Sequence, residues 1–130
     1  MHPLGVFVAF FLPQSCTEFF TEIHRGFYNF IQSQIKVQFE TFKQSLEHST
    51  PPEGISVHLL SMWYDARKDW DRAHQMVNGL EDANASWVHA YLHRKEGDVG
   101  NADYWYRKAN KKRPGITLDE EWESIVKALL

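Results

Sequence analysis

Two similar segments of the chain lie 29 residues apart and constrain the fold more than any other feature. The stretch "RKDWDRA" (67–73) aligns with "EGDVGNA" (96–102), which places Asp69 on Asp98. In each segment an aromatic-rich helical stretch precedes a tight turn, and Asp is a residue type that caps a new helix. An Ala follows the Asp after four residues, and so small a side chain lets two antiparallel helices approach closely. The spacing predicts two consecutive helical hairpins.

The second hairpin carries a more specific pattern, over residues 83–116. Its turn is "KEGD" (95–98), and small, aromatic or Pro residues stand at Ala90, Ala102, Tyr106, Ala109 and Pro114. In these positions the segment resembles a tetratricopeptide repeat (TPR), a family whose repeat is two antiparallel helices over about 34 residues. The preceding unit, roughly 54–82, is about five residues shorter than that repeat, which predicts an abbreviated second helix.

The same region also resembles a group of small uncharacterised proteins that share a Tyr-Leu-His-Arg-x-Glu-Gly-Asp…Asn-Ala-x-Tyr-Trp-Tyr-Arg core, and that resemblance implies no activity. After it, Thr117 and Glu120 have the spacing of a capping box, and an apolar stripe follows. This segment predicts a C-terminal capping helix, which a short helical stack needs to cover its last face. The expected helices are 57–67, 71–80, 85–96, 99–111 and 118–129. No strand pattern competes, so we expect an all-α fold.

The first forty residues differ in composition from the rest. All nine Phe residues fall between Phe7 and Phe42, and all five Trp residues fall between Trp63 and Trp122. Apolar residues recur at steps of three and four, which predicts one stripe of a long amphipathic helix starting at about residue 17. The stripe consists of Phe20, Ile23, Phe27, Phe30, Ile31, Ile35, Phe39, Phe42 and Leu46. "HSTPPEG" (48–54) then ends the helix.

These patterns divide the chain into three parts. We expect an aromatic-rich extension over 1–36, the end of the long helix with a Pro linker over 37–53, and a TPR-like domain over 54–130. The aromatic face of the long helix requires a partner, which would be the rest of the chain, a second copy in a homodimer, or a membrane surface. Few basic residues line its polar face, so the membrane is the weakest of these alternatives.

A secretory signal or membrane anchor at residues 1–16 is disfavoured. The apolar run at 4–12 is too short to cross a bilayer as a helix, and no Lys or Arg precedes it. No transmembrane segment is predicted, and a cytoplasmic location is expected. The single cysteine, Cys16, excludes an internal disulfide and a four-thiolate metal site.

The net charge of −3 disfavours a dedicated nucleic-acid binder, which needs a positive field toward the phosphates. One basic cluster exists, formed by Arg107, Lys108, Lys111, Lys112 and Arg113. It closes a predicted helix, where cations complement the helix dipole, and a phosphate-binding patch is the less favoured interpretation.

The main candidate site is the pair His89 and His93, which lie on one face of the expected helix 85–96. The repeat register and the apolar residues of this helix indicate different buried faces, so both hold only if the helix is central and packed on two sides. Three interpretations follow. The rings are hydrogen-bonded core residues, or they line a ligand pocket, or they chelate a transition metal such as zinc.

Each of the last two interpretations adds specific residues. A pocket for an anionic or polar ligand would recruit Arg94, Tyr104, Trp105, Tyr106 and Arg107. A metal site would recruit His74 or Glu96 as a third ligand, although two histidines are a weak signal and no Glu follows His89 as in zinc peptidases. Tyr104, Trp105 and Tyr106 are consecutive, so a helix cannot bury all three on one side.

No nucleophile motif or Gly-rich phosphate loop is present in the sequence, so an enzyme is unsupported without being excluded. The leading hypothesis is a small, soluble interaction or scaffolding module that binds a protein or peptide, with no cofactor. Trp105 or Tyr104 is its expected contact residue, because aromatic side chains are favoured anchors at interfaces. The alternative is a metal- or ligand-binding protein centred on His89 and His93.

Overall fold

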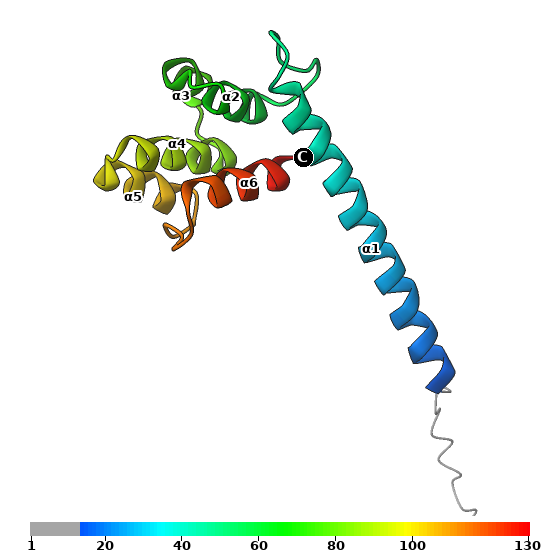
Figure 1. Cartoon of the computed structure of the whole chain (residues 1–130). Helices are drawn as coiled ribbons and strands as arrows, with labels where there is room; N and C mark the ends of the chain where they lie inside the picture. The colour runs from blue at the N-terminus through cyan, green and yellow to red at the C-terminus, as the bar shows by residue number, and fades with distance from the viewer. Residues whose placement is uncertain (1–13) are drawn as a thin grey trace, which may run out of the picture. The chain divides into compact units, whose positions relative to one another are not determined.

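The computed structural model describes residues 14–130, which form six helices and contain no strand (Figure 1). The helices are α1 (Gln14–Ser45), α2 (Val57–Ala66), α3 (Trp70–Val77), α4 (Ala83–Glu96), α5 (Val99–Lys108) and α6 (Leu118–Leu129). The all-α prediction is confirmed for this part of the chain. Helix α3 is the shortest of the six, with eight residues.

The chain divides into two compact units, Met1–Gln34 and Ile35–Leu130. In the first unit, the described residues belong to α1, whereas the apolar run at 4–12 lies outside the described residues. The second unit contains the end of α1, the helices α2 to α6 and the hydrophobic core.

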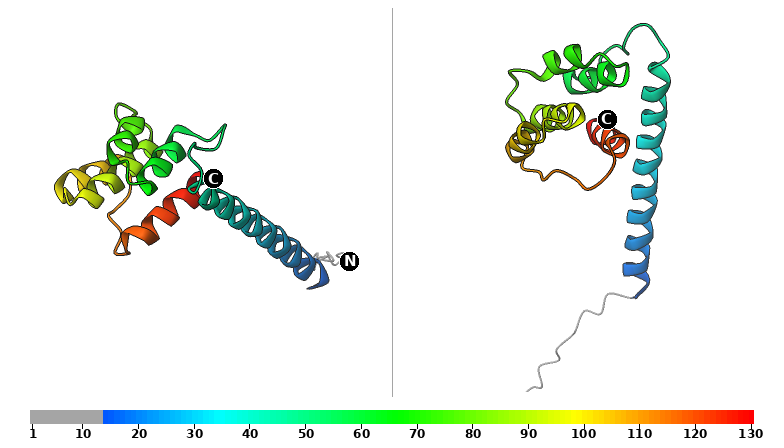
Figure 2. Two further views of the ribbon diagram at one scale, coloured as in Figure 1. Left: turned by 45° about the horizontal axis from the view of Figure 1, so that its top comes forward. Right: turned by 60° about the vertical axis from the view of Figure 1, so that its left-hand side comes forward.

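Helix α4 is the centre of the second unit. It packs against α5, α3, α6 and α2, and it lies between the α2–α3 pair and the other two helices in Figure 1 and in the right view of Figure 2. Eight consecutive or nearly consecutive residues of α4 are buried, namely Ala85, Ser86, Val88, His89, Ala90, Tyr91, Leu92 and His93. The expectation that this helix is packed on two sides is therefore confirmed, and it explains why polar residues are buried beside apolar ones.

Indole N–H groups connect the helices of the core over long stretches of sequence. Trp122 Nε1 donates to the carbonyl of Met62 at 3.2 Å, which ties α6 to α2. Trp70 Nε1 donates to the carbonyl of Leu92 at 3.1 Å, which ties the start of α3 to α4. Because buried Trp residues usually need a partner for this N–H, these bonds also fix the register of the helices.

Two buried carboxylates form the strongest polar contacts of this unit. Glu121 on α6 accepts hydrogen bonds from Arg94 and, at 2.5 Å, from the hydroxyl of Tyr106. Asp65 on α2 is bound by Lys95 at 2.9 Å and by Tyr91 at 3.3 Å. Burial and the neighbouring carboxylate raise the pKa of both tyrosine hydroxyls well above the ordinary value of 10.0. Each therefore remains a hydrogen-bond donor at neutral pH.

The turns of the two hairpins have the same backbone design. Lys68 has φ of +66° and Gly97 has φ of +91°, so each chain reversal passes through the left-handed region. The next residues, Asp69 and Asp98, cap α3 and α5 by accepting from a backbone N–H three residues later. Gly adopts positive φ at no steric cost, whereas Lys does so with strain.

Replacing Lys68 with Gly is expected to raise the free energy of unfolding by roughly 0.5–1 kcal/mol. The reverse test is Gly97→Ala, which should destabilise by about 1 kcal/mol, because a Cβ at this position meets nothing within 4 Å and only the backbone conformation is penalised. Urea unfolding followed by circular dichroism measures both changes. If both substitutions changed the free energy of unfolding in the same direction, the assignment of strain to Lys68 would be contradicted.

The first half of α1 is amphipathic but exposes its large apolar residues. They are Phe19, Phe20, Ile23, Phe27, Tyr28, Phe30 and Ile31. Phe39 and Phe42, by contrast, are buried in the core of the second unit. The single stripe predicted for α1 therefore has a buried end and an exposed beginning. Among the described helices, none is long and apolar enough to cross a membrane.

Candidate functional site

Three histidines from two helices meet beside the central helix. Helix α4 supplies His89 and His93, whose separation of four residues places them on one face. Helix α3 supplies His74, and the bond from Trp70 to the carbonyl of Leu92 holds α3 against this part of α4. His89 is only 3% exposed and His93 only 7% exposed. The cluster is therefore largely shielded from water.

The distances between the rings are short. His74 Nε2 and His89 Nε2 lie 2.8 Å apart, as in a hydrogen bond in which one ring donates and the other accepts. One nitrogen of each of the three rings lies within 4.8 Å of one nitrogen of the other two. Two nitrogens on one tetrahedral Zn²⁺ lie about 3.4 Å apart. The three nitrogens are therefore close enough to become ligands of one metal ion once the rings reorient and the bond between His74 and His89 opens.

Tryptophan rings cover two of the imidazoles. Trp105 stacks on His89 with ring centroids 3.9 Å apart, and Trp70 stacks on His74 at 4.8 Å. The two histidines of α4 also stack on each other at 4.9 Å. These flat contacts restrict the rotamers of the imidazoles.

Burial disfavours the charged form of two of the imidazoles, His89 and His74. Burial lowers the pKa of His89 to about 4, and the positive charges of His74, His93 and Lys108 add to the effect. Burial, with His93 as a further cause, also lowers the pKa of His74 below its ordinary value of 6.5. A neutral imidazole is the form that coordinates a metal ion. His74 and His89 thus favour the ligating protonation state at neutral pH.

Two buried polar atoms beside the cluster lack hydrogen-bond partners in the described part of the chain, whereas His93 has a close carboxylate partner. Neither His89 Nδ1 nor the hydroxyl of Ser86, one turn earlier, has a hydrogen-bond partner among the described residues, although both atoms are buried. Glu96 Oε1, in contrast, lies 2.5 Å from His93 Nδ1. A carboxylate on the outer nitrogen of an imidazole is the usual support of a metal-bound histidine.

Asn101 on α5 completes this side of the site. Its side-chain amide lies 3.2 Å from His93 Nε2 and 3.4 Å from His93 Nδ1. The sequence analysis did not identify Asn101 or Trp70 as site residues. Their recognition requires knowledge of how α3 and α5 pack against α4, since neither residue stands in a ligand motif.

The structure corrects part of the predicted ligand pocket. Arg94 does not face the histidines, because its guanidinium binds Glu121 and, at 2.5 Å, the carbonyl of Ile116. Tyr106 points to the same carboxylate. The physical reason is that a buried Glu121 requires charged and polar partners, which Arg94 and Tyr106 provide.

The remaining predicted residues are placed as follows. Trp105 is half-buried on His89, Tyr104 is exposed, and Arg107 is exposed near the end of α5. The expectation that the three consecutive aromatic residues cannot all be buried is confirmed. Glu96 does not belong to the cluster of three histidines; its Oε1 lies 2.5 Å from His93 Nδ1, and His93, Glu96 and Asp98 form a second group of possible metal ligands.

Three of the five basic residues at the end of α5 and just after it have partners within the chain. Lys111 lies over the ring of Trp87 at 3.9 Å, and Lys108 lies over Trp105 at 4.8 Å. Arg113 pairs with Asp103 at 2.9 Å. Cation–π contacts and an ion pair account for these side chains without a phosphate ligand.

Comparison of the chain with protein-family models, with curated proteins and with solved structures gives no match.

Proposed function

We propose that this protein binds a transition-metal ion through His74, His89 and His93. The observation that carries the proposal is the convergence of one nitrogen from each of three imidazoles within 4.8 Å, in a largely buried place. In catalytic zinc sites, the protein usually supplies three ligands, and water or substrate takes the fourth position.

The donor atoms indicate the class of metal. Three neutral imidazoles suit Zn²⁺, Cu²⁺, Ni²⁺ and Co²⁺, whereas Mg²⁺ and Ca²⁺ prefer oxygen ligands. Glu96 would orient His93 and increase its basicity through the bond to Nδ1. We expect no other carboxylate to be needed for binding.

The competing interpretation, in which the histidines are ordinary core residues, explains the cluster less well. Buried polar groups in a stable core are nearly always hydrogen-bonded, yet the buried His89 Nδ1 has no partner among the described residues. The lowered pKa of His89 means that the cluster destabilises the fold whenever it takes up a proton. Perturbed titratable groups of this kind gather at functional sites.

The two hairpins are also proposed to form a short TPR-like stack. Support comes from the shared turn design, with Lys68 and Gly97 both at positive φ, and from the small cluster in which Ala90, Ala102 and Tyr106 pack together. This scaffold would hold α3 and α4 side by side and so bring His74 to the other two histidines. Its role as an interaction module remains a proposal, for which Tyr104 offers the exposed aromatic side chain.

The test is a titration of chelator-treated, tag-free protein with Co²⁺, followed by visible absorption and calorimetry. We expect one ion per chain and the intense visible bands of a tetrahedral site. His74→Gln should weaken binding at least about 100-fold, since removing even an outer partner of a metal ligand costs 10- to 100-fold. His74 is the best position to change because it is less buried than the two histidines of α4.

The matched control is His48→Gln, an exposed histidine outside the cluster, which should bind Co²⁺ as the parent chain does. Circular dichroism shows whether each variant is folded. A folded parent chain that binds no Co²⁺, Zn²⁺, Ni²⁺ or Cu²⁺ would refute the proposal. An unchanged affinity in folded His74→Gln would refute the assignment of the ligands.

A further inference from the structure

The exposed apolar residues of α1 follow a heptad repeat. Steps of four and three residues connect Cys16, Phe20, Ile23, Phe27, Phe30, Gln34 and Val37, which are the a and d positions of three consecutive heptads. This period of 3.5 residues is typical of a coiled coil, whereas a helix packed on a globular core usually shows a period of 3.6. The a positions are residues 20, 27 and 34, and the last of them is the polar Gln34. A polar residue at an a position commonly fixes how the two helices of a coiled coil align.

The residues at these a and d positions form one apolar strip along the helix, called the seam below. The seam is large enough for a stable association with another helix. Phe20, Phe27 and Phe30 are each about 60% exposed, and Ile23 is half exposed. Phe19 and Ile31 stand on the two flanks of the seam and are exposed as well. Each exposed aromatic residue would bury on the order of 100 Å² in a contact. With the flanking residues, the seam approaches the roughly 800 Å² per partner of a standard interface.

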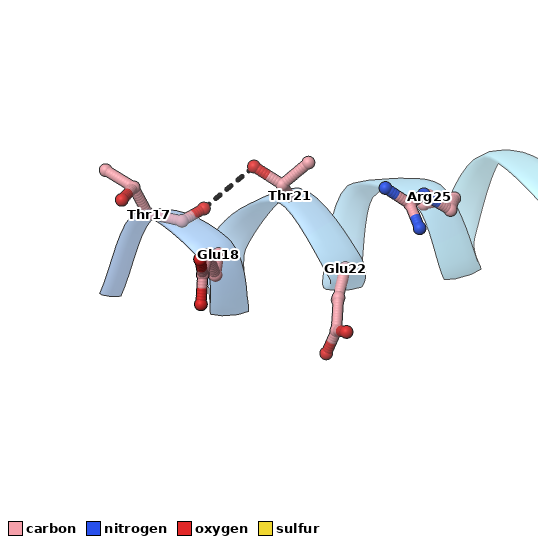
Figure 3. Close-up of a pocket in the computed structure, with 5 residues that line it drawn as sticks. All are labelled: Thr17, Glu18, Thr21, Glu22 and Arg25. Atoms are coloured by element: carbon pink, nitrogen blue, oxygen red, sulfur yellow. Dashed lines mark hydrogen bonds between the residues drawn. The ribbon is translucent and has the colours of Figure 1, made fainter. Parts of the chain in front are cut away.

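Charges are confined to the opposite face of the helix. Lys, Arg, Asp and Glu are absent from the a, d, e and g positions between residues 16 and 37. Figure 3 shows residues outside the seam, among them Glu18, Glu22 and Arg25, and the hydroxyl of Thr21, which donates to the carbonyl of Thr17 at 2.7 Å. A copy of this helix placed on the seam would therefore meet no like charge.

We propose that the seam of α1 binds the same seam of a second copy of this chain and forms a two-stranded coiled coil. The heptad period, the apolar area and the exclusion of charge from the seam all favour a copy of the helix. A membrane surface would require basic residues along the polar face, and Arg25 and Lys36 are the only Lys or Arg residues between residues 14 and 37.

Two neighbouring residues provide a matched test. Phe27 is 64% exposed at an a position of the seam, and Tyr28 is 62% exposed on the side of the helix outside it. The molar mass of the parent chain, of Phe27→Lys and of Tyr28→Lys is measured by light scattering after size-exclusion chromatography, with chelator present. We expect the parent and Tyr28→Lys to form dimers and Phe27→Lys to be monomeric, because the substitution places two lysines against each other in the seam.

Circular dichroism establishes that all three proteins are helical, so that a lost dimer does not reflect an unfolded chain. A parent chain that is monomeric at every concentration tested would overturn the proposal, as would a Phe27→Lys variant that still dimerises. Sedimentation with phosphatidylcholine–phosphatidylglycerol vesicles tests whether the seam binds a membrane surface instead of a second copy. Binding to vesicles by a parent chain that is monomeric without them would assign the seam to a membrane surface.

Discussion

Glu121→Ala is expected to lower the free energy of unfolding by about 3–5 kcal/mol. Glu121 is 1% exposed and receives hydrogen bonds from Arg94 and Tyr106. Its loss leaves the Tyr106 hydroxyl without its acceptor and the Arg94 guanidinium without its counter-ion, although Arg94 keeps the carbonyl of Ile116, and a largely buried charge without a counter-ion is costly. It also removes the only side-chain contact described between Arg94 and α6.

The matched control lies on the same helix. The Glu123 side chain is 47% exposed and pairs with Lys127 at the surface, so Glu123→Ala should change stability by less than about 0.5 kcal/mol. Glu121→Gln should cost less than Glu121→Ala, because the amide oxygen still accepts from Tyr106. Guanidinium unfolding monitored by circular dichroism measures all three. Similar losses for Glu121→Ala and Glu123→Ala would show that the buried pair does not stabilise α6.

Acidification of the metal-free protein from about pH 7 to about pH 4 should lower its free energy of unfolding by about 3 kcal/mol through His89 alone. The pKa of His89 is lowered to about 4 in the folded chain from 6.5. Between these two values the unfolded chain binds more protons than the folded chain, so acid favours unfolding. The contribution is fully present above the unfolded value and is lost as the pH falls toward 4. The lowered pKa of His74 acts in the same direction.

Urea unfolding at a series of pH values, with chelator present, measures how the free energy of unfolding changes with pH. This pH dependence is called the slope below. The double variant His74→Gln/His89→Gln should lose most of it, whereas the exposed His48→Gln should retain it. Other groups also contribute to the pH dependence of stability. Asp82, whose pKa is lowered, contributes at lower pH, and its contribution is the same in every variant. An unchanged slope between pH 6.5 and 4 in the double variant would contradict the neutral, buried state of the cluster.

The local elements could be predicted from the sequence because their signals are local. Asp98, Gly97 and the capping box of Thr117 and Glu120 mark helix ends through contacts within a few residues, and each has the expected geometry. The central position of α4 also follows from its sequence, since apolar and small residues occur on more than one face. Such patterns depend on helical geometry and not on distant partners.

The site was predictable only in part. The spacing of His89 and His93 identifies one face of one helix, but the third imidazole comes from α3, and its approach depends on tertiary packing. Arg94 was predicted to line a ligand pocket with these histidines, but its guanidinium binds Glu121, which lies 27 residues later on a helix whose placement no local pattern specifies. Long-range polar pairs of this kind carry no periodic signal.

The exposed seam of α1 has a similar explanation. Steps of three and four residues predict an apolar stripe, but they do not distinguish a stripe that covers a core from one that meets another helix. Only the structure separates Phe39 and Phe42, which are buried, from Phe20 and Phe27, which are exposed.

Helix α6 has a consequence for the synthesis of the protein. Ile125 and Val126 are fully buried in the same core as Phe39 and Met62, and Trp122 bonds to the carbonyl of a residue 60 positions earlier. On the ribosome, that core stays incomplete until residue 126 has left the exit tunnel. Until then the nascent chain displays the apolar faces of its earlier helices, and chaperones that recognise such segments are expected to bind it.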